Sequence, residues 1–200
     1  MVLLASSANY LNEGRSCHCQ STNLNSMKQR VTLILITFFI LGVVQRTFAQ
    51  SWKGFKGTNY AIKYPDTWSL DTSKGMGTAF IIFSQLENDS DKFRENVNMI
   101  VQDLTAQNIN LDDYVKISEK QIKGFMTEGK IYESERLKAG QGEYQKIIFS
   151  GTQGAFHLKF EQYYFVKNKN AYVVTLTAAA DKFDYYKPTG EQILKSFILN

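Results

Sequence analysis

Cysteine is nearly absent from this sequence of 200 residues. Cys17 and Cys19 flank His18, and no cysteine follows them. Three adjacent residues cannot supply the four ligands of a closed zinc site, so we predict no metal there. A disulfide framework and a catalytic thiol are excluded for residues 50–200, because that region holds no cysteine.

Histidine is also scarce, which excludes most familiar catalytic arrangements. Beyond residue 50 only His157 remains, so any histidine-dependent site must use it. A serine-histidine-acid site also needs an activated serine, and the sequence has no G-x-S-x-G motif. Paired glycines occur at predicted hairpins and not between a strand and a helix, which excludes a phosphate-binding loop. We therefore predict no catalytic residue, no bound metal and no cofactor.

Net charge is low once the N-terminal segment is set aside. The whole chain carries a formal charge of +4, but residues 1–49 hold four basic residues and one acidic residue, which leaves +1 for residues 50–200. Such a balance does not favour nucleic acid or an anionic membrane surface as a partner. Residues 50–200 are numerous enough to form one compact domain with a sizeable core.

A secretory signal peptide is predicted over residues 27–49. Met27 opens a short basic stretch, the apolar run Val31–Val44 follows, and Ala49 is the small residue that signal peptidase prefers. We place the cleavage between Ala49 and Gln50. A transmembrane anchor is disfavoured because the apolar run is shorter than the roughly 20 residues that span a bilayer. No cysteine follows the run, so a lipid anchor would lack its attachment residue.

The chain is thus divided into three parts. Residues 1–26 are polar and irregular, and we interpret them as an extension that precedes the true start at Met27. Residues 27–49 direct export, and residues 50–200 form a single domain. The predicted product is secreted or periplasmic, with no stable membrane span after cleavage.

The clearest structural signal is the run from Glu143 to Ala180. Three segments there alternate β-branched or aromatic residues with polar ones, and only the short turns GTQG and NKN separate them. Turns this short cannot hold a crossover helix, so the neighbouring strands are predicted to be antiparallel. One face carries an apolar row that Gln162 interrupts. The opposite face is predicted to be only partly covered.

Further strands are predicted on either side of this run. NYAIKYP alternates until Pro65, which cannot donate a ladder hydrogen bond. TAFIIFSQL is apolar on both faces, as a central strand is, and NVNMIVQDL gives another strand. The polar segment KIYESERLK is typical of an edge strand. Ser51–Thr58, which is punctuated by two glycines, is interpreted as a lead-in that Trp52 and Phe55 anchor onto the rest of the domain. Trp68 and Leu70 are interpreted as a short return segment.

A helix is predicted from Leu111 to Glu128. Asn110 is a suitable N-cap, and the two aspartates of the first turn complement the helix dipole. Gly129 is expected to leave the helix in a left-handed conformation. The apolar stripe of this helix consists of Leu111, Val115, Ser118, Ile122, Phe125 and Met126.

A second helix is predicted to begin at Pro188, because proline is favoured at the first helical position. Gly190 lies inside it and lowers its helix propensity. Its apolar stripe consists of Tyr186, Ile193, Leu194 and Phe197.

Three segments of the chain carry a family resemblance. They are Tyr60–Pro65 continued to Trp68, the strand NVNMIVQDL followed by the helix LDDYVKISEKQI, and the terminal Ile193–Phe197. In this order they resemble the PsbP-like family, including its bacterial DcrB-type members. The resemblance implies an α+β fold, an α/β/α sandwich around a mainly antiparallel sheet.

The same resemblance implies a function class, because the family consists of non-enzymatic accessory and binding proteins. Some members support photosystem II assembly in the thylakoid lumen, a role for which this sequence offers no context. DcrB-type members are extracytoplasmic envelope proteins, usually with a lipobox cysteine that this chain lacks. Membrane attachment is therefore not carried over.

The sequence thus predicts an extracytoplasmic binding or accessory protein without catalysis, whose partner is an unknown protein or small ligand of the cell envelope. Two alternatives stay open: a carrier of a small apolar ligand between sheet and helix, and an enzyme of an unrecognised class. The candidate binding face is the less-covered side around His157, Tyr163 and Phe165. Alanine substitutions there are expected to impair binding and to leave stability mostly intact.

Overall fold

The structure is a computed structural model that describes residues 50–140 and 142–200. Gln50 is its first described residue. The predicted extension, the start at Met27, the signal peptide and Ala49 lie outside the described residues.

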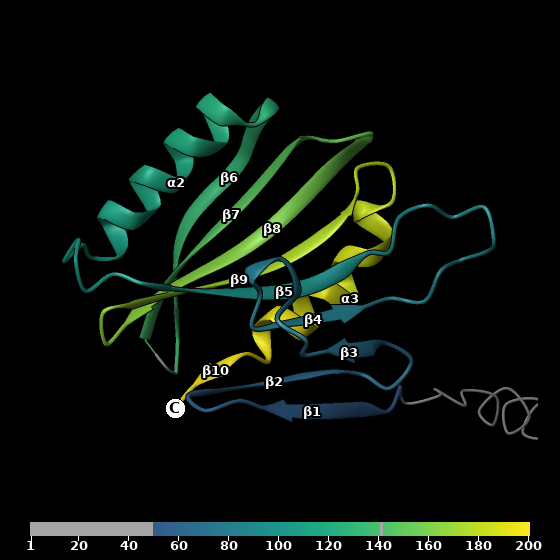
Figure 1. Cartoon of the computed structure of the whole chain (residues 1–200), viewed down its shortest axis with the longest axis horizontal. Helices are drawn as coiled ribbons and strands as arrows, with labels where there is room; N and C mark the ends of the chain where they lie inside the picture. The colour runs from purple at the N-terminus through teal and green to yellow at the C-terminus, as the bar shows by residue number, and fades with distance from the viewer. Residues whose placement is uncertain (1–49, 141) are drawn as a thin grey trace, which may run out of the picture. The chain divides into compact units, whose positions relative to one another are not determined.

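A seven-stranded sheet forms the centre of the domain (Figure 1), and each pair of neighbouring strands in it is antiparallel. The predicted three-strand run is confirmed, because β7, β8 and β9 follow one another through short turns. The predicted central strand is β4, which lies between β3 and β5, and the predicted edge strand is β6. In spatial order the strands are β3 (Ser69–Asp71), β4 (Phe80–Phe83), β5 (Asn96–Asp103), β9 (Asn170–Ala179), β8 (Phe156–Lys167), β7 (Gly142–Gln153) and β6 (Thr127–Ala139).

A second, three-stranded sheet was not predicted. It consists of β1 (Trp52–Lys56), β2 (Tyr60–Pro65) and β10 (Ile198–Leu199), with β2 in the middle. The predicted lead-in thus contains a strand that was not predicted, while its predicted anchors Trp52 and Phe55 do pack against the hydrophobic core. Gly57 serves the hairpin turn, because a Cβ there would lie 2.4 Å from the Tyr60 ring. Gly57 thus marks the turn of the hairpin, whereas Gly54 lies within β1 and pairs with Lys63 of β2.

The first helix, α2 (Leu111–Phe125), begins as predicted and ends earlier. The Asn110 side chain accepts a hydrogen bond from the backbone N–H of Asp113 at 2.9 Å, which confirms the N-cap. The left-handed residue after the helix is Glu128, with φ of 57°, and not Gly129. Gly129 is required for another reason, because a Cβ there would lie 2.0 Å from the carbonyl oxygen of Ile122.

The second helix, α3 (Phe183–Lys195), begins before the predicted Pro188, which lies inside it. Phe183 and Tyr186 are buried, so their packing secures the additional first turn in spite of the proline. A short 3₁₀ helix, η1 (Gly75–Gly77), occupies the loop before β4.

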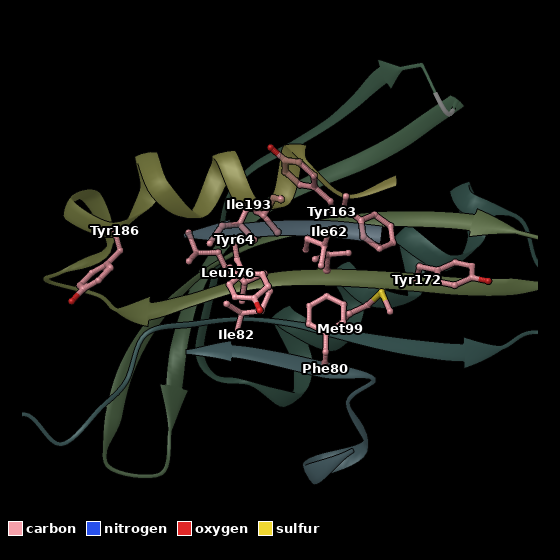
Figure 2. Close-up of a cluster of buried hydrophobic side chains, with 14 of the residues drawn as sticks. Ile62, Tyr64, Phe80, Ile82, Met99, Tyr163, Tyr172, Leu176, Tyr186 and Ile193 are labelled. Carbon is pink, nitrogen blue, oxygen red and sulfur yellow. The ribbon is translucent and has the colours of Figure 1, made fainter. Parts of the chain in front are cut away.

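The two helices lie on opposite faces of the large sheet, which gives the predicted α/β/α arrangement (Figure 1). The main core lies between the sheet, α3 and β2, as Figure 2 shows for Ile62, Leu176 and Ile193. A smaller core lies beneath α2. It consists of Val115, Ile122, Ile147, Phe149, Leu158, Phe160, Tyr164 and Val173.

Candidate binding groove

A groove of about 530 Å³ separates part of α2 from the large sheet. Its volume falls within the range of roughly 300–1,000 Å³ that small-molecule pockets occupy. Five strands supply its sheet side, namely β5, β7, β8 and β9, with Thr127 at the start of β6. It is lined by Ile100, Gln102, Tyr114, Ser118, Gln121, Ile122, Phe125, Met126, Thr127, Phe149, Thr152, Gln153, Gln162, Tyr164 and Val173.

The position of α2 explains why the groove exists. On its outer side the helix is fastened to the edge strand β6 by the salt bridge between Asp112 and Arg136. Ser134 also donates a hydrogen bond to Glu119 at 2.6 Å. Only Val115 and Ile122 of the helix are buried. The helix therefore covers the β6 side of the face closely and leaves lining residues of β5 and β9 accessible from the groove.

The groove floor is apolar because alternate residues of adjacent strands share one face. Ile100 of β5 pairs with Val173 of β9, which in turn pairs with Tyr164 of β8. Phe149 of β7 extends this floor. Phe125, placed in the predicted buried stripe, is instead 85% exposed at the end of α2, because the chain turns into β6 there and Met126 packs inward against Gly151.

Polar groups in the lining are amides and hydroxyls that hold one another in place. The Gln162 side chain donates a hydrogen bond to Thr175 Oγ1 at 3.0 Å and accepts one from the Tyr164 hydroxyl. The Tyr114 hydroxyl donates to Gln102 Oε1. Burial raises the pKa of both tyrosines, so both hydroxyls stay neutral at neutral pH. The lining holds no Asp, Glu, Lys, Arg or His and therefore carries no charge.

The predicted binding face does not form one site. Tyr163 and Phe165 are only 2% and 4% exposed, so the expectation that their side of the sheet is less covered was wrong. Tyr163 packs against Tyr144 with ring centroids 4.9 Å apart, and Phe165 packs against Phe197 at 5.3 Å. The unpredicted three-stranded sheet and α3 cover this face. Both residues belong to the main core.

His157 lies apart from them, with its side chain 52% exposed, beside Glu128 and Thr152. Thr152 donates a hydrogen bond to Glu128 at 2.8 Å, and its hydroxyl lies 3.4 Å from His157 Nδ1. Glu128 Oε2 lies 3.9 Å from the same ring nitrogen. A catalytic relay needs the nucleophile and the acid on opposite nitrogens of the imidazole. This cluster therefore does not have the geometry of a nucleophile–histidine–acid relay.

The groove residues were missed because their signal in the sequence is weak. Gln162 stood out as a polar interruption of an apolar row, and in the structure it is the hydrogen-bonded amide of the groove floor. Gln102 and Gln121 gave no signal, since exposed amides are common on strands and helices.

Residues 50–140 and 142–200, which the structure describes, were compared with the requirements of a metal site and of a membrane span. In these ranges, no three His, Cys, Asp or Glu side chains are grouped to hold a metal ion. None of the helices formed there has the length and apolarity to cross a bilayer.

Comparison with solved structures identifies the fold. The cyanobacterial PsbP (CyanoP) of Synechocystis sp. PCC 6803 superimposes with a TM-score of 0.55 at 16% identity, over 80% of this chain and 99% of that one. The fold is PsbP-like. No protein-family profile and no curated protein sequence matches the chain.

Two further PsbP-like structures support the assignment. PA94 of Pseudomonas aeruginosa, a protein of unknown function, has a TM-score of 0.52 at 12% identity, over 74% of this chain and 96% of that one. LpqN of Mycobacterium tuberculosis, described as involved in cell envelope biogenesis, has a TM-score of 0.50 at 11% identity, over 78% of this chain and 87% of that one. At identities this low, the structural similarity establishes the PsbP-like fold and does not establish the DcrB-type subgroup.

Proposed function

We propose that this protein is an exported, non-catalytic binding protein of the cell envelope, and that the groove beneath α2 holds a small uncharged ligand that is mostly apolar. The observation that carries the proposal is the composition of the lining, in which aromatic and aliphatic side chains alternate with amides and hydroxyls and no side chain is charged. Sites of this composition take ligands with an apolar body and a few neutral hydrogen-bonding groups.

The uncharged lining of the groove favours uncharged ligands over ionic ones. An ionic headgroup placed in this groove would lose hydration and gain no opposite charge, which is unfavourable. A neutral polar group can both donate to and accept from the amides of Gln102, Gln121 and Gln153. The proposal therefore develops the carrier of a small apolar ligand, and it favours neutral over ionic ligands.

The lack of charge in the groove also supports a role without catalysis. General acid or base chemistry needs a group that gains or loses a proton near the working pH. The titratable side chains of the lining are tyrosines with raised pKa values. The buried glutamates Glu95 and Glu161 do not line the groove.

Two observations support a place in the envelope. The sequence contains a predicted secretory signal over residues 27–49 with cleavage between Ala49 and Gln50. LpqN, whose fold this chain shares, is involved in cell envelope biogenesis.

Displacement of the neutral fluorophore N-phenyl-1-naphthylamine tests the proposal. Dodecanol should displace it from the protein at least roughly tenfold more effectively than dodecanoate or dodecylammonium, because only the alcohol brings no charge into the groove. Gln121→Glu keeps the side-chain shape and adds a charge, so it should weaken dodecanol binding. Tyr185→Phe, on α3, is the control and should change nothing. Equal displacement by the three compounds, or none by dodecanol, would contradict the proposal.

A further inference from the structure

A second hollow adjoins the groove. It has a volume of about 170 Å³ and lies between the first half of α2 and the end of β5 with the loop that follows. Four residues line both hollows, namely Gln102, Tyr114, Ser118 and Gln121. The second hollow is completed by Asp103, Leu104, Gln107, Ile109 and Ile117. The two hollows are therefore neighbours along the same side of α2.

The contact between Tyr114 and Gln102 stands at their junction. The Tyr114 hydroxyl of α2 donates a hydrogen bond to Gln102 Oε1 of β5, and both side chains line both hollows. The Tyr114 ring also packs against Tyr164 of the groove floor, with centroids 6.0 Å apart. This bond joins α2 to the sheet through two side chains that line both hollows.

The bond is of a kind that a ligand can open. It joins two neutral groups at the protein surface, where a single hydrogen bond contributes little net free energy. Gln102 is exposed and Tyr114 is only partly buried, so both side chains can change rotamer while the helix stays in place. The salt bridge and hydrogen bond that fasten α2 to β6 lie on the other side of the helix.

The second hollow is partly apolar. Three of the nine residues that line it are apolar, namely Leu104, Ile109 and Ile117, and the other six are polar. The carboxylate of its one acidic residue, Asp103, already accepts a hydrogen bond from the backbone N–H of Thr105 at 2.8 Å. An uncharged alkyl end gains from burial against these three apolar side chains, whereas an anionic end would be repelled by Asp103.

We infer that the Tyr114–Gln102 hydrogen bond is a gate that sets the length of the ligand. With the bond closed, a neutral ligand is confined to the main groove; with the bond open, its apolar end extends into the second hollow. This inference rests on the proposed function, since it concerns the ligand of the same groove. Tyr114 and Gln102 are then residues that determine ligand length.

The test compares alcohols of different length on variants that lose the bond and keep the fold. Tyr114→Phe retains the ring and removes the hydroxyl, and Gln102→Leu removes the acceptor. In both, the ratio of tetradecanol to octanol effectiveness in displacing N-phenyl-1-naphthylamine should rise roughly threefold to tenfold above the wild-type ratio. A purely structural effect would shift both alcohols together. Tyr185→Phe is the matched control, because it removes a tyrosine hydroxyl far from the groove lining.

The outcomes separate the two proposals. The double variant should show the same gain as either single variant, because both remove one bond. If the alcohols bind and their length preference is unchanged in both single variants, the gate is overturned and the binding groove stands. If no alcohol binds the wild type or any variant, the proposed function is overturned and the gate with it.

Discussion

Gly190 of α3 lies against Leu176 of β9 so closely that a Cβ on the glycine would stand 2.4 Å from Leu176 Cδ2. The glycine is buried, and its lack of a side chain allows the helix to approach the sheet. From the sequence alone, Gly190 was expected only to lower the helix propensity of this segment. In the structure it positions α3 on the main core.

Gly190→Ala should therefore destabilise the protein, although alanine is the better helix former. Relief of the glycine penalty contributes about 1 kcal/mol, whereas forcing a methyl group into a packed core costs about 1–3 kcal/mol. Gly124→Ala in α2 is the matched control, since nothing lies within 4 Å of a Cβ there, and it should stabilise the protein. Urea unfolding measures both. Stabilisation by both substitutions would show that α3 is not packed as described.

Glu161 should make the stability depend on pH. It is fully buried, and neither carboxylate oxygen makes a hydrogen bond to a described residue; the Tyr163 hydroxyl lies nearby without meeting hydrogen-bond geometry. Burial raises its pKa above the ordinary value of 4.5, and the nearby Glu191 adds to this, while Lys187 and Lys146 oppose it. The folded state thus binds more protons than the unfolded state. The contribution of the protonated Glu161 to the free energy of unfolding is fully present below pH 4.5. It is lost as the pH rises through the raised pKa of this carboxyl group.

Glu161→Gln should remove this part of the pH dependence and raise the unfolding midpoint at neutral pH. Urea unfolding at about pH 4 and about pH 8 gives the measurement. Glu95, which is also buried with a raised pKa, keeps its own contribution in the variant. Asp89→Asn, at an exposed position, is the control. A variant as pH-dependent as the wild type would mean that Glu161 stays solvated.

Phe165→Ala and Tyr163→Ala should cost about 3–5 kcal/mol of unfolding free energy, because each truncates an aromatic residue of the main core. His157→Ala should change stability by about 0.5 kcal/mol or less, since its side chain is half exposed. Chemical denaturation distinguishes the two cases. If the alanine variants of Tyr163 and Phe165 were stable but bound ligand poorly, these residues would belong to a binding face and not to the core.

Export should yield a protein that begins at Gln50. Signal peptidase accepts small residues before the cut, so Ala49→Arg should block cleavage and leave residues 27–49 attached. Intact-mass measurement of the protein from the extracytoplasmic fraction reads out both results. A product retained in the cytoplasm at full length would contradict the predicted signal peptide.

The fold was largely predictable because its strands alternate strongly and its turns are short. The run from Glu143 to Ala180 and the cap at Asn110 needed only local information. The coverage of the sheet was not predictable in this way. Phe165 packs against Phe197, which lies near the C-terminal end of the sequence. The β1–β2 hairpin, from the N-terminal part of the domain, packs into the same core.

The groove escaped sequence analysis for a similar reason. It depends on how far α2 stands from the sheet, which is set by contacts such as Asp112 with Arg136 that link distant parts of the chain. Phe125 continued the apolar stripe, but the helix ends there and the next residue packs inward. A helical period cannot show where the chain will turn.

The most direct test of the account is an NMR titration of the isotope-labelled protein with dodecanol. Saturable amide shift changes should be confined to the groove, on α2 from Tyr114 to Phe125, on Met126 and Thr127, and on the facing residues of β5, β7, β8 and β9, including Gln162 and Val173. Dodecanoate at equal concentration should give weaker changes at the same amides. Shift changes that cluster elsewhere, or none at all, would contradict the claim that this groove binds an uncharged ligand.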